Sequence, residues 1–268
     1  MVVKNTSTFI FISYLNISEI MDISPLMTQM IIAGVLSAAL SMIAYRFRAL
    51  TFWGAVASFF VGYTVGIFGS IQWLILLVGF TLVGLAITKM DISDKRVHGL
   101  LEGEDGERTH MNVIGVGLPA CIVAILYAIS HAYVGTTYDL ALTVAFICTL
   151  TVAAADTVAS EIGTRDKKVW LITTFERVKR GTNGGISVLG TASSLVAATI
   201  TCLVGWLLIF EGVDSFILIP IFAGFMGNII DSLLGATLES RKLISKYTNN
   251  CVSALLGAAI GAILIILL

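Results

Sequence analysis

Apolar residues occur along this chain in long uninterrupted runs, separated by short polar segments. Each run is close to the ~20 residues that a helix needs to cross the hydrocarbon core of a membrane. None of the runs alternates in the way that is typical of an outer-membrane β-strand. The pattern predicts eight membrane-spanning helices, over Pro25–Ala44, Leu50–Phe68, Ile71–Thr88, Met111–Ser130, Thr137–Val158, Gly185–Phe210, Phe216–Leu234 and Cys251–Leu268.

The composition supports a membrane protein. Of the 268 residues, 57% are hydrophobic and only 12% are charged. A soluble domain cannot bury that proportion of apolar surface, so a lipid bilayer must surround the helices. We therefore expect an all-α, polytopic integral membrane protein. It would have one membrane domain over residues 25–268 and a peripheral segment over residues 1–24.

Basic residues are concentrated in the loops on one side of the predicted bundle. All but Lys4 of the 16 Lys and Arg residues follow the first, third, fifth or seventh predicted span. Because cytoplasmic loops carry an excess of Lys and Arg, these four loops are predicted to face the cytoplasm. Both termini are then predicted to lie on the outer side of the membrane, which we expect to be the cell membrane.

A polar pattern occurs twice in the second half of the chain. One copy reads ADTVASEIGTR over 155–165 and TNGGISVLGTA over 182–192. The other reads IDSLLGATLESR over 230–241 and TNNCVSALLGAA over 248–259. Both copies cross the membrane in the same sense, which predicts a parallel repeat with halves of about 137–210 and 216–268. Polar positions repeated at the edges of apolar spans indicate one shared site on the cytoplasmic face.

Two carboxylates lead the candidate chemistry. At helical spacing, Asp231 shares a polar stripe with Asn228, Ser232, Gly235 and Glu239. Asp156 shares another with Ser160 and Gly163, and Glu161 lies on the adjoining face. Because Mg²⁺ prefers one or two carboxylates plus substrate phosphates, Asp156 and Asp231 are the candidate metal ligands. The alternative is helix packing, which stays open for the Ser and Gly positions and is weaker for costly intramembrane acids.

The segment RGTNGGIS, over 180–187, is a candidate phosphate-binding turn. A glycine-rich turn that opens a helix presents backbone N–H groups and the positive end of the helix dipole. The segment lacks the GxxxxGK[ST] pattern of a P-loop. It also reads as a tight helix entry with Thr182 or Asn183 as N-cap. Its recurrence as TNNCVS, over 248–253, favours the binding interpretation and places Asn183 and Asn249 at helix starts. Arg108, His110 and Asn112 are further candidate pocket residues, although Arg108 also fits a membrane-edge anchor.

These motifs resemble a known family. ADTVASEIG, GTNGGISVLGTAS, GNIIDSLLGATLE and the later TNN are similar to motifs of a polytopic family that includes transmembrane protein 19 and the plant phytyl-phosphate kinases. The resemblance implies a prenyl-phosphate kinase that uses Mg²⁺. It would transfer the terminal phosphoryl group of a nucleoside triphosphate, CTP in the plant enzymes, to a prenyl monophosphate.

The resemblance and the polar pattern together assign roles to individual residues. The catalytic set is Asp156, Glu161, Asn228 and Asp231. The set for nucleotide binding is Lys179, Arg180, Thr182, Asn183, Gly184, Gly185, Ser187, Ser160, Ser232, Glu239, Asn249 and Asn250.

The expected partners are a prenyl monophosphate lipid, the nucleotide and membrane lipids. No nucleic acid is expected, and a homo-oligomer stays open. Two other functions also stay open. A CTP-dependent lipid-phosphate cytidylyltransferase would release pyrophosphate instead of a nucleoside diphosphate. A cation or small-anion transporter would also show internal repeats, but its site should lie near the membrane midplane.

Overall fold

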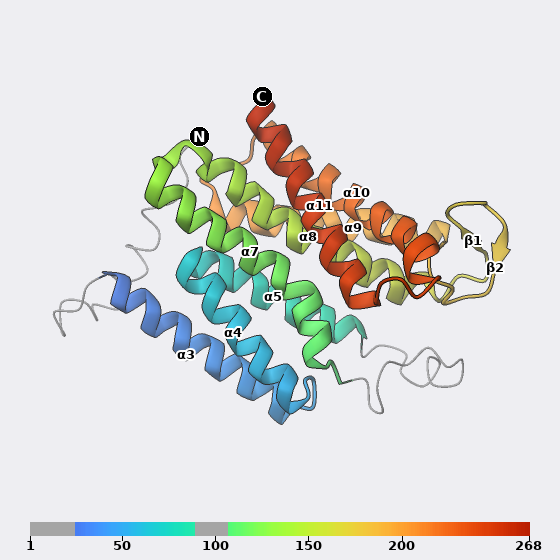
Figure 1. Ribbon diagram of the computed structural model, residues 1–268, viewed down its shortest axis with the longest axis horizontal. Helices are drawn as coiled ribbons and strands as arrows, with labels where there is room; N and C mark the ends of the chain where they lie inside the picture. The colour runs from blue at the N-terminus through green and yellow to red at the C-terminus, as the bar shows by residue number, and fades with distance from the viewer. Residues whose placement is uncertain (1–24, 89–106) are drawn as a thin grey trace.

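The computed structural model describes residues 25–88 and 107–268, so the predicted peripheral segment lies outside the described residues. Most of the described chain is helical (Figure 1). Each predicted span coincides with a helix, and the ends differ by a few residues. The helices are α3 (Pro25–Arg46), α4 (Phe52–Phe68), α5 (Ile71–Thr88), α7 (His110–Val134), α8 (Asp139–Gly163), α9 (Val188–Ile209), α10 (Leu218–Leu234) and α11 (Lys246–Leu267).

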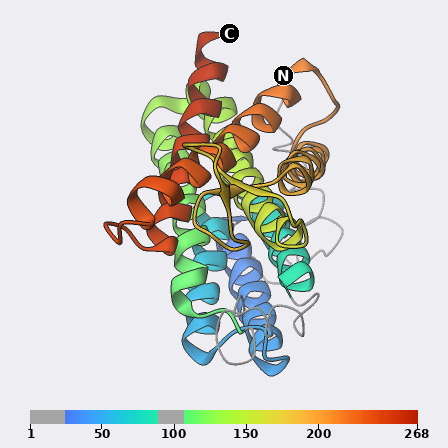
Figure 2. The same cartoon turned by 90° about the vertical axis from the view of Figure 1, so that its right-hand side faces the viewer.

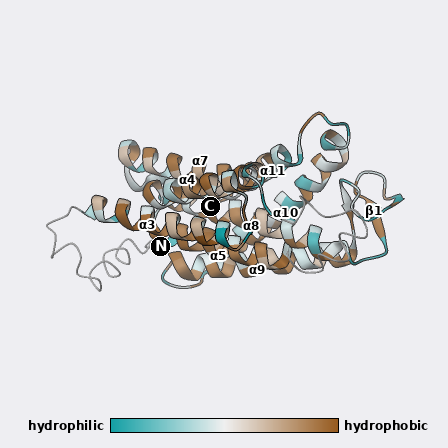
Figure 3. Ribbon diagram, turned by 90° about the horizontal axis from the view of Figure 1, so that it is seen from below, coloured by the Kyte–Doolittle hydropathy of each residue, from teal (hydrophilic) through white to brown (hydrophobic). Residues whose placement is uncertain are grey.

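Within the described residues, six helical stretches are long and apolar enough to cross a membrane. One of them, His110–Gly163, contains both α7 and α8, which the short 3₁₀ turn Gly135–Tyr138 joins. Helix α4 is apolar but shorter, with 17 residues. Hydrophobic residues cover the helices, and hydrophilic residues gather at the end that carries the strands (Figure 3). The number of helices that cross the bilayer, and the internal repeat, stay predictions.

Helix α8 forms the centre of the bundle and packs against α5, α7, α9, α10 and α11. Its middle turns carry Phe146, Ile147 and Leu150, which are completely buried. The ring of Trp73 from α5 stacks on Phe146 with centroids 4.1 Å apart. Large apolar side chains on the outer helices are exposed instead, as lipid contact requires.

Two glycines bring α10 and α11 close to α8. A Cβ atom on Gly227 of α10 would lie 2.3 Å from the side chain of Val152, and one on Gly257 of α11 would lie 2.5 Å from it. Residues four apart lie on the same helix face, so each contact repeats one turn later. One turn beyond Val152 and Gly227 are Asp156 and Asp231. The close approach at the glycines therefore sets the two acids opposite each other.

The connection from α8 to α9 forms a small antiparallel sheet, which lies beyond the helix ends (Figure 2). Its strands are β1 (Val169–Leu171), β2 (Arg177–Val178) and β3 (Gly185–Ile186), in the order β2-β1-β3. The prediction of an all-α chain missed this sheet. The prediction that a helix begins at Gly185 was also wrong, because Gly185 pairs with Leu171 in the sheet.

The described loops rich in basic residues lie at one end of the bundle. These are the connections from α3 to α4, from α8 to α9 and from α10 to α11 (Figure 1). The C-terminus lies at the opposite end. The structure thus gathers the loops that the charge pattern assigned to one side. That this side is cytoplasmic stays a prediction.

Candidate functional site

A cavity of about 500 Å³ opens at this end of the bundle. The helices α5, α8 and α10 end around it, and α7, α9 and α11 begin there. Most of the predicted site residues line it. They are Asp156, Ser160, Glu161, Thr182, Asn183, Gly184, Gly185, Ser187, Asn228, Asp231, Ser232, Glu239, Asn249 and Asn250. The duplicated motifs therefore meet at one place.

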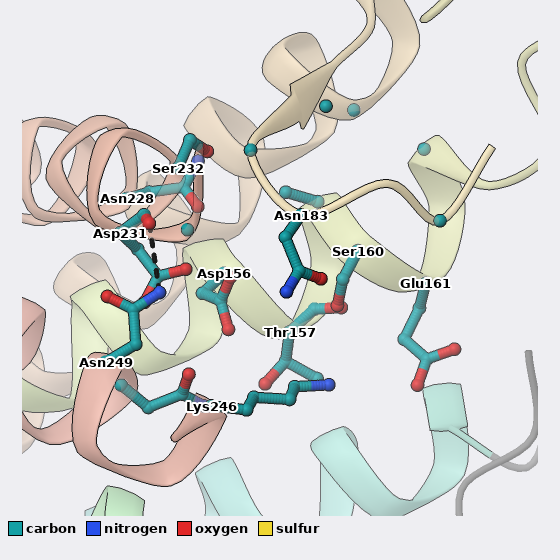
Figure 4. A pocket seen from close by; sticks show the side chains of 18 of the residues that line it. Asp156, Thr157, Ser160, Glu161, Asn183, Asn228, Asp231, Ser232, Lys246 and Asn249 are labelled. Carbon is teal, nitrogen blue, oxygen red and sulfur yellow. Dashed lines mark hydrogen bonds between the residues drawn. The ribbon is translucent and has the colours of Figure 1, made fainter. Parts of the chain in front are cut away.

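Asp156 and Asp231 lie next to each other in the cavity wall, with their carboxyl groups turned toward one another (Figure 4). Their carboxyl groups lie close enough to interact directly. Helix α11 holds Asp231 at two points. The hydroxyl of Ser253 donates to its Oδ1 at 3.0 Å, and Nδ2 of Asn249 donates to its main-chain carbonyl at 3.0 Å. Asp231 is thus held in place and directed toward Asp156.

The other two predicted catalytic residues, Asn228 and Glu161, line the same cavity as the two acids. Asn228 is buried, lines the cavity and stands one turn before Asp231 on α10. Glu161 lines the cavity as well, but Figure 4 draws its carboxylate apart from the acid pair. Ser160, which was predicted to bind nucleotide, donates its hydroxyl to the carbonyl of Thr157 at 3.0 Å, a contact within its own helix.

The glycine-rich turn forms part of the cavity wall but does not open a helix directly. Helix α9 begins at Val188, and its N-cap is Ser187, which accepts from the N–H of Gly190 at 3.0 Å. The predicted position of Asn183 at a helix start, and the alternative caps Thr182 and Asn183, were therefore wrong. Strand β3 separates the turn from α9, and the carbonyl of Gly184 accepts a hydrogen bond from the N–H of Ile172 at 3.0 Å. In the second copy, Asn249 does lie in the first turn of its helix, which Ser245 caps.

Gly184 packs directly on the helical turn that continues α10. This turn, Gly235–Glu239, is a π-helix, and the N–H of Ser240 donates to the carbonyl of Gly235 at 3.0 Å. The φ angle of Gly184 is +73°, and a Cβ atom there would lie 2.4 Å from the Cβ of Ala236. Only glycine fits this contact, so the close approach of the two motifs depends on it.

The predicted cations are placed differently. Lys179 is exposed, and Nη1 of Arg180 donates to the carbonyl of Thr164 at 3.1 Å. Neither residue lines the cavity. Lys246, the first residue of α11, lines it and extends into it (Figure 4). The sequence held a signal for Lys246, because it precedes Asn249 by three residues, as Arg180 precedes Asn183.

Arg108 and Asn112 line the cavity, as the sequence suggested, whereas His110 does not. Backbone hydrogen bonds join Arg108 to the segment before α4: its N–H donates to Ala49, and its carbonyl accepts from Thr51. Its guanidinium donates to the hydroxyl of Thr88 at 2.9 Å. Arg108 is therefore held at the junction of α4, α5 and α7.

Asp156 and Asp231 are the residues of the cavity that could hold a Mg²⁺ ion. Among the described residues, no three His, Cys, Asp or Glu side chains gather into a candidate metal cluster. Mg²⁺ usually keeps several waters and binds through one or two carboxylates plus phosphate oxygens. The carboxylates of Asp156 and Asp231 could supply those one or two ligands.

Comparison with known proteins decides the family. The model of the family described as integral membrane protein DUF92 matches residues 35–262. The chain belongs to this family. The family relationship indicated by the sequence motifs is thereby confirmed. No solved structure matches the chain.

Several relatives are similar over most of the chain. An uncharacterized membrane protein of Methanocaldococcus jannaschii is 28% identical over 246 residues, which is 91% of this chain and 97% of the relative. The chloroplastic protein VTE6 of Arabidopsis thaliana is 30% identical over 221 residues, which is 80% of this chain and 64% of VTE6. Protein PGR of the same plant is 28% identical over 237 residues, which is 82% of each chain.

Proposed function

We propose that this protein is an enzyme whose cavity binds a nucleoside triphosphate, preferably CTP, and a prenyl monophosphate. The enzyme would transfer the terminal phosphoryl group of the nucleotide to the prenyl monophosphate. The product is a prenyl diphosphate, and the reaction requires Mg²⁺. The observation that carries the proposal is the convergence of Asp156 and Asp231 on one cavity that the duplicated amide and glycine motifs also line. The family relationship and the resemblance to the plant phytyl-phosphate kinases support the choice of substrate.

In the proposed reaction, an oxygen of the acceptor monophosphate attacks the terminal phosphorus of the nucleotide. The bond from that phosphorus to its bridging oxygen breaks, and the nucleoside diphosphate leaves. The acceptor is already an anion, so no strong general base is required, and catalysis depends on positioning and charge stabilisation. When bound, Mg²⁺ would neutralise charge on the transferred group.

Individual residues would divide this work. Asp156 and Asp231 would hold the metal, with Asn228 beside them on α10. Lys246 would interact with phosphate oxygens from the opposite wall of the cavity, because its side chain extends into that space. Arg108, beside the start of α4 and the end of α5, is placed to receive the anionic headgroup of a lipid whose tail lies among the helices. The nucleotide would enter from the cytoplasm.

The position of the cavity favours an enzyme over a transporter. A transport site is expected near the membrane midplane with access from both faces. The residues that line this cavity come from the ends of the helices instead. A cytidylyltransferase would use the same acids, so only the released product separates it from a kinase.

The test uses purified protein in detergent with CTP or ATP labelled at the terminal phosphate, prenyl monophosphates of several lengths, and Mg²⁺ or EDTA. We expect label in the prenyl diphosphate and a nucleoside diphosphate as the second product, both only with Mg²⁺. Asp156→Asn and Asp231→Asn should each lower turnover by at least about 100-fold, because each removes one charge from the metal site. Both variants should remain folded by size-exclusion chromatography.

Pyrophosphate release would identify a cytidylyltransferase instead. Full activity in both Asn variants would overturn the metal assignment. Movement of prenyl phosphate or an ion across liposomes without nucleotide would favour transport.

A further inference from the structure

We propose that Glu239 is a positioning residue that joins the glycine-rich turn to Asp231 and binds neither metal nor nucleotide. This inference rests on the proposed function and changes the role that the sequence suggested for Glu239. Three features carry this role: the hydrogen bonds of its carboxylate, the orientation of Asn249 and the π-helical turn that holds Glu239.

Both carboxylate oxygens of Glu239 already accept a hydrogen bond from an amide. Nδ2 of Asn183 donates to Oε1 at 3.0 Å, and Nδ2 of Asn249 donates to Oε2 at 3.1 Å. The two asparagines occupy corresponding places in the duplicated motifs. One carboxylate thus links the equivalent amides of the two copies, which lie 56 and 10 residues from it along the chain.

The orientation of the Asn249 amide follows from its partners. Its nitrogen faces two acceptors, the carbonyl of Asp231 and Oε2 of Glu239, so a flipped amide would lose both bonds. In this orientation Oδ1 of Asn249 is buried and has no hydrogen-bond partner in the described part of the chain. An unpaired buried carbonyl is costly. The fold tolerates this cost at the residue that connects Glu239 with Asp231.

The π-helical turn gives Glu239 its place. It adds a residue to the turn, and the positions after Gly235 therefore leave the stripe that α-helical spacing predicted. The same turn carries Ala236, against which Gly184 packs. The glycine-rich turn therefore contacts the π-helix both through Gly184, which packs on Ala236, and through Asn183, which bonds to Glu239.

Together these contacts form one path from the glycine-rich turn to the metal-binding acid. Asn183 bonds to Glu239, Glu239 to Asn249, and Asn249 to the backbone of Asp231. A change at Glu239 should therefore alter the relative position of the turn and Asp231 without removing a group that touches substrate. Small displacements of this kind chiefly lower kcat.

The test exchanges the partners of one hydrogen bond. Asn183→Asp places a second carboxylate against Glu239 and should lower kcat by about tenfold or more, while the KM for nucleotide changes less. Glu239→Gln keeps an oxygen for Asn249 and should have a smaller effect, because the exposed Asn183 amide can rotate to accept from the new amide. The pair Asn183→Asp/Glu239→Gln restores a donor, an acceptor and the net charge. It should recover most of the kcat that Asn183→Asp loses.

Hydrogen exchange of the full-length protein in detergent, without nucleotide, supplies a readout independent of activity. The amides of residues 181–187 should exchange faster in Asn183→Asp and return toward the wild-type rate in the pair. Glu176→Gln is the matched control. Like Glu239→Gln, it removes one carboxylate charge, but from the β1–β2 hairpin, where Glu176 contacts Thr174 outside the cavity. It should change neither kcat nor the exchange rate.

Two results would overturn the inference. One is a pair that behaves no better than Asn183→Asp in both kcat and exchange. The other is a Glu239→Gln variant that loses Mg²⁺ or nucleotide binding which the pair does not restore, because the carboxylate would then bind the ligand directly. If the pair restores exchange while the wild type transfers no phosphate, the proposed function fails and the positioning role stands.

Discussion

Replacing Gly184 with alanine tests whether the contact between the glycine-rich turn and the π-helix builds the site. The residue has a φ of +73°, and a Cβ atom added to it would lie 2.4 Å from the Cβ of Ala236 and 2.6 Å from its backbone nitrogen. The neighbour includes backbone atoms of a helix, so it cannot move aside as a flexible side chain can.

The structure sets the size of the effect. Ordinary carbon contacts begin near 3.4 Å, so the turn and the π-helix must separate by about 1 Å to accommodate the methyl group. A displacement of that size at a catalytic site typically costs about 100-fold in rate. The positive φ adds about 1–3 kcal/mol of backbone strain to the folded state.

The assay compares Gly184→Ala with Gly135→Ala by steady-state turnover and by thermal unfolding in detergent. Gly135 also has a positive φ, +76°, with ψ at −149°, but a Cβ atom there would meet nothing within 4 Å. It lies between α7 and α8, outside the residues that line the cavity. We expect Gly135→Ala to lower stability and keep turnover, and Gly184→Ala to lower both.

Turnover of Gly184→Ala within about twofold of the wild type would refute the reasoning, because the turn would then not need its close contact with Ala236. Equal loss of turnover in both variants would show that backbone strain alone accounts for the effect.

Two further predictions address the groups around the acids. Ser253→Ala removes the hydroxyl that donates to Oδ1 of Asp231, and should lower kcat by about tenfold and raise the Mg²⁺ concentration needed for half-maximal rate; an unchanged Mg²⁺ titration would contradict the role of this bond. Lys246→Met should raise the KM for nucleotide by about tenfold, whereas Lys179→Met should leave it unchanged, because only Lys246 lines the cavity. The opposite order would restore the assignment that the sequence suggested for Lys179.

Local patterns predicted much of this site because the motif occurs twice. The positions of Asp156 and Asp231 at the edges of apolar spans, where an acid is costly unless it has a function, mark them as a pair. Helical spacing placed Asn228 and Asp231 on one face. These inferences depend on helical periodicity and on the recurrence of a motif, both of which are visible along the chain without its tertiary structure.

The cations and the glycine-rich turn depended on information that spacing does not contain. Lys179 and Lys246 both stand near a Thr-Asn pair, and only the path of the chain decides which one enters the cavity. The turn at Gly184 leads into a strand because it pairs with β1, which lies before it in the same loop. Such pairing is tertiary, so helix propensity alone misplaced the start of α9.

The sequence by itself determined that the chain is helical and membrane-embedded, and that its polar chemistry gathers at one end of the helices. Long apolar runs allow little else, because backbone groups in lipid must be satisfied within each segment. Only the tertiary structure decided that Val152 meets Gly227 and Gly257, which sets Asp156 against Asp231, and that a π-helical turn directs Glu239 to both asparagines. Those arrangements come from how closely separate helices approach, and that distance is a property of the packed bundle.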